Sequence, residues 1–249
     1  MQKTFFILFI LLYFYGCGTT SQTANNSPSF SPLLKETFQE FNPSTWQKAN
    51  WDMPKPFGCG WLEQNVEING TNLLLHLSTT PAYGKEYSAA EYRTLNTYMY
   101  GKYSVKFQAS DINGTISSFF TYTGEAEGTQ WDEIDIEILG KDTTKMQVNY
   151  RRDGHEHPHI IDLGFDASKA IHLYSFIFTP EYIQWYVDDV LVYQVDENHL
   201  QNQDSLPING GKIILNFWPA VDVDEWSGHY DGNSTGVVIY EEVRFEELI

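Results

Sequence analysis

The segment from residue 131 to residue 139 alternates strictly between two kinds of side chain. In an extended strand successive side chains point to opposite faces, so Trp131, Glu133, Asp135 and Glu137 share one face and isoleucines occupy the other. This alternation predicts a strand of an antiparallel sheet with one buried face. It does not require every polar position to be acidic, and like charges two residues apart repel each other. The row of carboxylates therefore indicates a function.

The spacing of Glu133 and Glu137 is compatible with one kind of chemistry. Their α-carbons lie roughly 13 Å apart in a strand that rises about 3.3 Å per residue. On a concave sheet the two carboxyl groups can approach to about 5–6 Å, the separation used by retaining glycosidases and shorter than that of inverting ones. The spacing agrees with a retaining mechanism without proving one.

The rest of the chain has the pattern of an all-β domain. Short apolar or alternating runs recur from Phe38 onward between turn signals, which is typical of a sandwich or a barrel. Asp188-Asp189 is predicted to join two runs as a hairpin. The predicted strands are 73–77, 100–107, 116–122, 146–150, 174–178, 182–187, 190–195, 213–218 and 237–245.

Length and composition limit the classes of partner. The chain has 249 residues, of which 42% are hydrophobic, and it can bury the core of one domain, placed at residues 36–249. The formal net charge of −18 disfavours nucleic acid and anionic membrane surfaces, so a neutral polymer suits it better. Most of the 16 Tyr, 16 Phe and 7 Trp are expected to pack between sheets, and the remainder can stack on sugar rings. We expect a monomer.

The N-terminus is typical of an exported protein. Residues 1–16 hold an apolar stretch that is short for a membrane span and is predicted to be a signal peptide. Cys17 follows a small residue, as in the lipobox of bacterial lipoproteins, so Cys17 is the predicted lipidation site and residues 17–35 a flexible tether. Phe14 and Tyr15 are unusual in a lipobox, which leaves plain secretion as the alternative. The membrane is expected as a partner only through this lipid.

Other strands present polar and aromatic side chains on one face. By alternation, Ser118, Phe120 and Tyr122 share a face, as do Gln147, Asn149 and Arg151, and also Asn216 and Trp218. If these faces line one groove, that groove is built from amides and aromatic rings. Such a groove suits a neutral oligosaccharide.

The acidic segment, followed by Leu-Gly-Lys-Asp-Thr-Thr-Lys, closely resembles the active-site strand of the bacterial lichenases, the 1,3-1,4-β-glucanases of glycoside hydrolase family 16. Segments 91–93, 117–124, 128–130, 164–168, 185–188 and 224–228 are similar to that family in the same order, and the resemblance covers about residues 38–245. It implies a β-jelly-roll sandwich of two curved antiparallel sheets with a concave substrate cleft. The implied activity is endo-hydrolysis of mixed-linkage β-glucan, without a catalytic cofactor.

The resemblance also implies roles for single residues. Glu133 would be the nucleophile, Glu137 the general acid and base, and Asp135 a hydrogen-bond partner that separates their ionisation states. The implied sugar-stacking residues are Phe120, Tyr122, Trp131, Trp218 and Trp226. The implied partners of sugar hydroxyls are Glu91, Arg93, Asn149 and Asn216.

Several alternatives stay open. The acidic strand lacks the extra bulge residue of laminarinase-like relatives, which places it with lichenases and with transglycosylases of xyloglucan and fungal walls. A transglycosylase shares the covalent intermediate, and activity on xyloglucan or laminarin is a further alternative. A non-catalytic lectin could use the same fold but has no need of both Glu133 and Glu137.

Some positions depart from the family pattern. The family disulfide would join Cys59 to position 89, which is Ala89 here, so Cys59 is predicted to be a buried free thiol. Arg151 stands where the family has a tyrosine, and Pro219 follows Trp218, which leaves the preferred β-glucan open.

Metal binding is a separate expectation. Relatives carry a structural calcium ion held largely by main-chain carbonyls, with Glu241 near the equivalent position, and backbone ligands leave little trace in a sequence. His155, His157 and His159 alternate and could ligate a metal, but a solvated hairpin explains them better, since no fourth ligand is evident.

Overall fold

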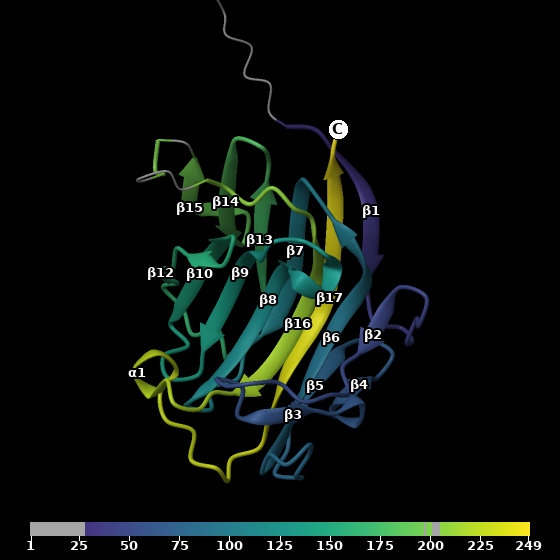
Figure 1. Cartoon of the computed structure of the whole chain (residues 1–249), viewed down its shortest axis with the longest axis vertical. Coiled ribbons are helices and arrows are strands. Elements are labelled where there is room, and N and C mark those ends of the chain that lie inside the picture. Colours follow the sequence, from purple (N-terminus) through teal and green to yellow (C-terminus); the bar gives the residue numbers. More distant parts are fainter. Residues whose placement is uncertain (1–27, 197, 201–204) are drawn as a thin grey trace, which may run out of the picture.

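The computed structural model describes residues 28–196, 198–200 and 205–249. These residues form two large β-sheets that pack against each other (Figure 1). Helical structure in this part of the chain is limited to α1 (Asp224–Ser227) and two single 3₁₀ turns, Glu63–Asn65 and Glu125–Glu127. The predicted all-β sandwich is confirmed.

The first sheet, sheet A, forms the back of the molecule behind the acidic strand. Its edge-to-edge order is β15, β14, β13, β7, β17, β5, β4, and β1 pairs with the C-terminal half of β17. The strands are β15 (Val190–Asp196), β14 (Tyr182–Val187), β13 (His172–Phe178), β7 (Gly101–Gln108), β17 (Gly236–Leu248), β5 (Leu73–Leu77), β4 (Val66–Ile68) and β1 (Phe30–Glu36).

The second sheet, sheet B, contains the acidic strand β9. Its order is β11, β10, β9, β8, β16, β6, β2, with β12 also on β10 and β3 parallel to β6; the other pairs of both sheets are antiparallel. The strands are β11 (His155–Glu156), β10 (Lys145–Arg152), β9 (Asp132–Leu139), β8 (Thr115–Thr123), β16 (Gly211–Pro219), β6 (Tyr87–Tyr98), β2 (Trp46–Lys48), β12 (His159–Asp162) and β3 (Cys59–Trp61).

Each of the nine runs predicted from the sequence overlaps a strand. Asp188 and Asp189 connect β14 to β15 with φ values of 48° and 62°, the left-handed conformation required at both positions of a type I′ hairpin turn.

One boundary differs from the prediction. Residues Phe30–Glu36, which fall mostly in the predicted tether, form β1 and pair with β17. Composition identified the Ser- and Pro-containing segment as a linker, but a strand partner more than 200 residues away leaves no local signal.

The predicted signal peptide and Cys17 lie outside the described residues. Within the described ranges, the chain has no helix with the length and apolar character needed to span a membrane.

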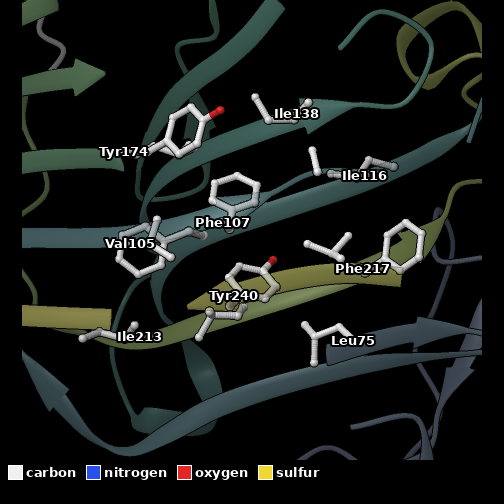
Figure 2. Close-up of a cluster of buried hydrophobic side chains, with 14 of the residues drawn as sticks. Leu75, Val105, Phe107, Ile116, Ile138, Tyr174, Ile213, Phe217 and Tyr240 are labelled. Carbon is white, nitrogen blue, oxygen red and sulfur yellow. The ribbon is translucent and has the colours of Figure 1, made fainter. Parts of the chain in front are cut away.

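Aromatic side chains fill much of the space between the sheets (Figure 2). Phe107 of β7 stacks on Tyr240 of β17 with ring centroids 5.3 Å apart, and Tyr103 stacks on Phe176 at 4.6 Å. The same core is enclosed by further buried side chains: Leu75, Val105, Ile116, Ile138, Tyr174, Ile213 and Phe217. The prediction that most aromatic residues serve packing is therefore confirmed for this interior.

Two buried side chains of sheet A hydrogen-bond to the backbone of sheet B. The indole Nε1 of Trp185 donates to the carbonyl of Asp135 at 3.1 Å. The hydroxyl of Tyr240 donates toward the carbonyls of Ser118 at 2.8 Å and Asn216 at 3.3 Å. These bonds fix β9, β8 and β16 from behind, directly beneath the residues of the opposite face.

Cys59 is a free, fully buried thiol, as predicted. It lies in β3, where Trp61 pairs with Ala89 of β6. Burial raises the pKa of the Cys59 thiol, so it behaves as a small apolar side chain.

Replacement of Tyr240 by Phe is expected to destabilise the fold by about 1–3 kcal/mol, because two buried carbonyls lose a donor while the packed ring stays. The midpoint of urea denaturation measures this change. Tyr186→Phe is the matched control, since the Tyr186 hydroxyl donates to the half-buried Gln184 side chain and, among the described residues, to no buried carbonyl. Equal effects of the two substitutions would show that the cross-sheet bond is unimportant.

Candidate active site

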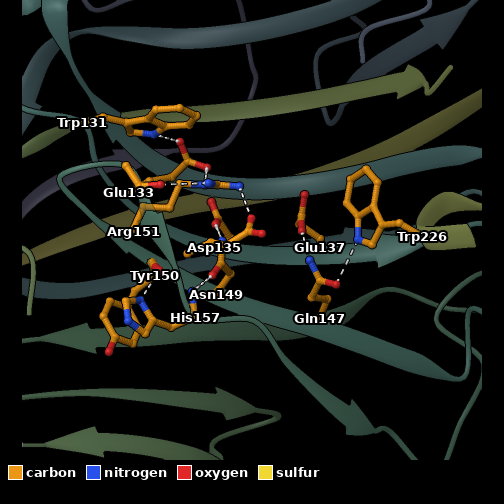
Figure 3. Close-up of polar contacts among 12 residues, drawn as sticks. Trp131, Glu133, Asp135, Glu137, Gln147, Asn149, Tyr150, Arg151, His157 and Trp226 are labelled. Carbon is orange, nitrogen blue, oxygen red and sulfur yellow. Dashed lines mark hydrogen bonds and ion pairs between the residues drawn. The ribbon is translucent and has the colours of Figure 1, made fainter. Parts of the chain in front are cut away.

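Side chains of five neighbouring strands form rows across one face of sheet B. Glu137 lies opposite Gln147 of β10 and Ser118 of β8, and the same row continues to Asn216 and Glu91. The next two rows pair Asp135 with Asn149 and Phe120, and Glu133 with Arg151 and Tyr122. The predicted faces of these strands therefore lie together on one surface of sheet B, and Figure 3 shows the side chains of β9 and β10 on it.

Glu133 is held by an indole and a guanidinium. The Nε1 atom of Trp131 donates to Glu133 Oε2 at 2.8 Å, and Arg151 Nε lies 3.7 Å from Glu133 Oε1. Burial raises the pKa of Glu133, whereas the Trp131 hydrogen bond, the Arg151 charge and a hydrogen bond from Asp135 oppose this rise. These three interactions favour the carboxylate form.

Asp135 lies between the two glutamates and is 3% exposed. Burial, followed by the charges of Glu133 and Glu137, raises the pKa of Asp135 well above its usual range. Its carboxyl accepts a hydrogen bond from Asn149 Nδ2 at 2.9 Å. Asp135 is therefore the member of the triad most suited to carry a proton and to donate it to Glu133.

Glu137 has a different environment. Gln147 Nε2 donates to Glu137 Oε2 at 2.7 Å, while Gln147 Oε1 accepts from Trp226 Nε1 at 3.0 Å, so one amide links the carboxyl to the ring (Figure 3). Burial and the charge of Glu133 raise the pKa of Glu137 to about 7, against the lowering effects of Gln147 and Arg151. At neutral pH this carboxyl retains a proton for a substantial fraction of the time.

The triad thus contains two carboxyl groups, Glu133 and Glu137, that can play different chemical roles. At Glu133 three neighbours counteract the burial that raises its pKa, so this carboxyl group can act as a nucleophile, whereas Glu137 can donate a proton near neutral pH. Environments that separate the ionisation of two carboxyls in this way are the basis of paired acid and nucleophile chemistry.

The four predicted hydrogen-bonding residues are brought to the same face, but much of their bonding capacity is used internally. Glu91 is 2% exposed and pairs with Arg93, whose Nε donates at 2.8 Å. Asn216, also 2% exposed, donates to Glu91 at 3.3 Å and accepts from the Ser118 hydroxyl. Asn149 accepts from the main-chain N–H of His157 at 2.8 Å. They form the base of the site.

The predicted aromatic residues differ in exposure. Trp131 is 42% exposed, and Tyr122 meets it edge-on at 6.2 Å; Phe120, Tyr122 and Trp226 are half-buried. Trp218 is 5% exposed because Phe57 covers its ring at 4.2 Å. Its surface available to a sugar is therefore small.

A hollow of about 850 Å³ lies at the Trp226 end of the site. It is lined by Glu86, Tyr87, Ala220, Val221, Asp222, Val223, Asp224, Glu225, Trp226, His229 and Tyr230.

Three residues that shape the site were not identified from the sequence. Gln147 was placed on the correct face but not assigned to Glu137, and strand alternation combined with strand order would have found it. Phe57 covers Trp218, and Trp51 lies 5.0 Å beneath the Arg93 guanidinium. Both belong to irregular segments, where alternation gives no indication of direction.

Two of the three alternating histidines, His157 and His159, stack on aromatic rings. His157 stacks on Tyr150 at 4.2 Å and His159 on Tyr193 at 4.0 Å, which gives both a packing role. The described ranges contain no group of three or more His, Cys, Asp or Glu side chains placed to hold a metal ion.

Similarity to known proteins identifies the family of this chain. Residues 53–235 match the glycosyl hydrolases family 16. The chain is 44% identical over 246 residues to a beta-glucanase of Paenibacillus polymyxa (98% of each chain) and 45% identical over 223 residues to one of Paenibacillus macerans (87% of this chain, 91% of that one).

The fold agrees with these matches. A crystal structure of a prokaryotic beta-1,3-1,4-glucanase (lichenase) derived from a mouse hindgut metagenome superposes with a TM-score of 0.81 at 42% identity, over 87% of this chain and 99% of that one. Together with the paired carboxyl groups on β9, these similarities establish that the chain belongs to glycosyl hydrolase family 16.

Proposed function

We propose that this protein is an endo-acting β-glucanase that hydrolyses mixed-linkage 1,3-1,4-β-glucan by a retaining double displacement. The main observation is the pair Glu133 and Glu137 on one face of β9. Burial raises the pKa of both carboxyl groups, that of Glu137 to about 7, while hydrogen bonds from Trp131 and Asp135 and the charge of Arg151 counteract the rise at Glu133. Relatives named beta-glucanase and a solved structure named lichenase support the substrate class.

The chemistry proceeds in two steps. Glu133 attacks the anomeric carbon while Glu137 gives its proton to the leaving glycosidic oxygen, which leaves a glycosyl ester on Glu133 and a charged Glu137. Glu137 then takes a proton from water, and the resulting hydroxide attacks the anomeric carbon and releases Glu133 as a carboxylate. Asp135 donates a hydrogen bond to Glu133 in its charged form and so favours its departure in this second step.

The surroundings suit a neutral polymer. Half-buried or exposed rings on both sides of the triad, Tyr122 and Trp131 at one end and Trp226 at the other, provide surfaces on which sugar rings stack. The net charge of −18 would repel anionic polysaccharides.

Wild-type protein is expected to release reducing sugar from lichenan and barley β-glucan faster than from laminarin, xyloglucan or agarose. Glu133→Gln is expected to reduce this rate by several orders of magnitude, since no glycosyl ester can form. Linkage analysis of products identifies the bond cleaved. Undiminished activity of the variant would disprove the nucleophile assignment, and products longer than the substrate in the presence of acceptor oligosaccharides would indicate a transglycosylase.

The pH dependence of kcat/KM tests the assignment of Glu137 as the general acid. If Glu137 must be protonated, kcat/KM falls above about pH 7, where its carboxyl loses the proton. Gln147→Leu removes a hydrogen bond that favours the charged form, so the pKa of Glu137 rises further and the alkaline limb moves to higher pH. An alkaline limb that does not move in this variant would contradict the assignment.

We propose that calcium, if bound, has only a structural role, held mainly by main-chain carbonyls near Glu241. Glu241 is exposed and occupies the irregular position between Tyr240 and Glu242 in the pairing of β17 with β7. The double displacement itself uses no metal.

We further propose export with lipidation at Cys17, which rests on residues 1–17 alone. In a bacterial host that processes lipoproteins, the wild-type chain should be recovered in the membrane fraction and Cys17→Ser should not. Membrane association of both forms, or of neither, would refute the lipid anchor and leave plain secretion.

A further inference from the structure

We propose that Arg151 is a positioning residue for the nucleophile, held by Glu156 and Trp131 so that its guanidinium keeps Glu133 ionised in acidic solution. The inference rests on the proposed function, because it assigns a role in the same reaction. It concerns a position where the family resemblance leads to a tyrosine and this chain has an arginine.

Three contacts fix the Arg151 side chain, which Figure 3 shows beside Trp131 and Glu133. Its Nη2 atom donates to Glu156 Oε2 at 2.6 Å, its Nη1 atom donates to the carbonyl of Gly154 at 3.3 Å, and its guanidinium lies 4.7 Å from the Trp131 ring centroid. The same tryptophan donates from Nε1 to Glu133. Arg151 and Glu133 therefore share one supporting ring.

The third nitrogen of the Arg151 guanidinium, Nε, lies near the nucleophile. Nε is buried, has no hydrogen-bond partner among the described residues, and lies 3.7 Å from Glu133 Oε1. This distance is beyond a hydrogen bond but well within the range of a strong charge interaction. Because Arg151 and Glu133 are directly paired in the register of β10 and β9, the backbone itself maintains this proximity.

A fixed positive charge at this place has a defined effect. It favours the carboxylate of Glu133 and so opposes the burial that raises the pKa of this group. Glu156 acts in the opposite direction, since its charge raises the pKa of Glu133 while its hydrogen bond orients Arg151.

Other ionisable groups surround the pair. On β9 these are Asp135 and Glu137, on β8 it is Tyr122, on β11 it is Glu156, and the charges near Tyr122 are Arg93, Glu125 and Glu127. Of the ionisable groups named in this paragraph, Arg151 is the positively charged one that lies within 4 Å of the Glu133 carboxyl group.

The test compares kcat/KM on barley β-glucan from pH 4.5 to pH 8 for wild type, Arg151→Met, Arg151→Lys and Glu156→Gln. For Arg151→Met, the ratio of variant to wild-type kcat/KM should fall on the order of tenfold between pH 7 and pH 5, because Glu133 becomes protonated at higher pH without the cation. Arg151→Lys should recover part of this loss, since it keeps the charge without the planar fork. For Glu156→Gln the ratio should rise toward acidic pH.

Arg152→Met is the matched control. Arg152 adjoins Arg151 in sequence but pairs with Asp132 at 3.1 Å on the opposite face of the strand, so its removal should leave the shape of the pH profile unchanged. A ratio for Arg151→Met that stays constant with pH, or one that Arg152→Met reproduces, would overturn the proposal. If Arg151→Met does not fold, the pH profiles of Arg151→Lys and Glu156→Gln test the proposal instead. The proposal fails if neither pH profile differs from that of wild type. Activity retained in Glu133→Gln would instead refute the proposed function.

Discussion

The burial of three carboxyl groups on one strand is the constraint on which the site depends. Glu133, Asp135 and Glu137 are too close and too desolvated to be charged together, so the surrounding residues must distribute protons among them. Trp131 and Arg151 favour charge on Glu133, whereas Glu137 lies farther along the strand with only an amide donor. The asymmetry that the reaction needs arises from these unequal partners.

The scaffold keeps this arrangement rigid. β9 lies between β8 and β10, and a one-residue slip in either pairing would turn all three acids toward the core. Trp185 and Tyr240 add cross-sheet bonds to the backbone of β9, β8 and β16. Stacked rings between the sheets resist deformation, so the position of the carboxyls is set by the packed interior.

Some aromatic residues near the acids lie outside the strands of sheet B. Trp226 follows β16 and reaches the triad through Gln147, while Phe57 precedes β3 and covers Trp218. Trp226 lies in the short helix α1 and Phe57 in the loop before β3, both outside the regular strands, where sequence can change without disturbing strand register. Arg151 differs, because it lies in a strand and alters the electrostatics of the nucleophile directly.

The sequence alone determined the acidic strand and nine further strands, the two faces of β9, and the face that Gln147, Asn149 and Arg151 share within β10 and that Phe120 and Tyr122 share within β8, because side chains alternate strictly along a strand. It also predicted a buried free Cys59, and the resemblance pointed to the carboxyl pair. Only the tertiary structure revealed that β1 belongs to the domain, that Phe57 covers Trp218, and that Glu91 and Asn216 are bonded internally. Those facts depend on contacts between residues far apart in the chain, and on competition among neighbours for the same hydrogen bonds, which a local pattern does not contain.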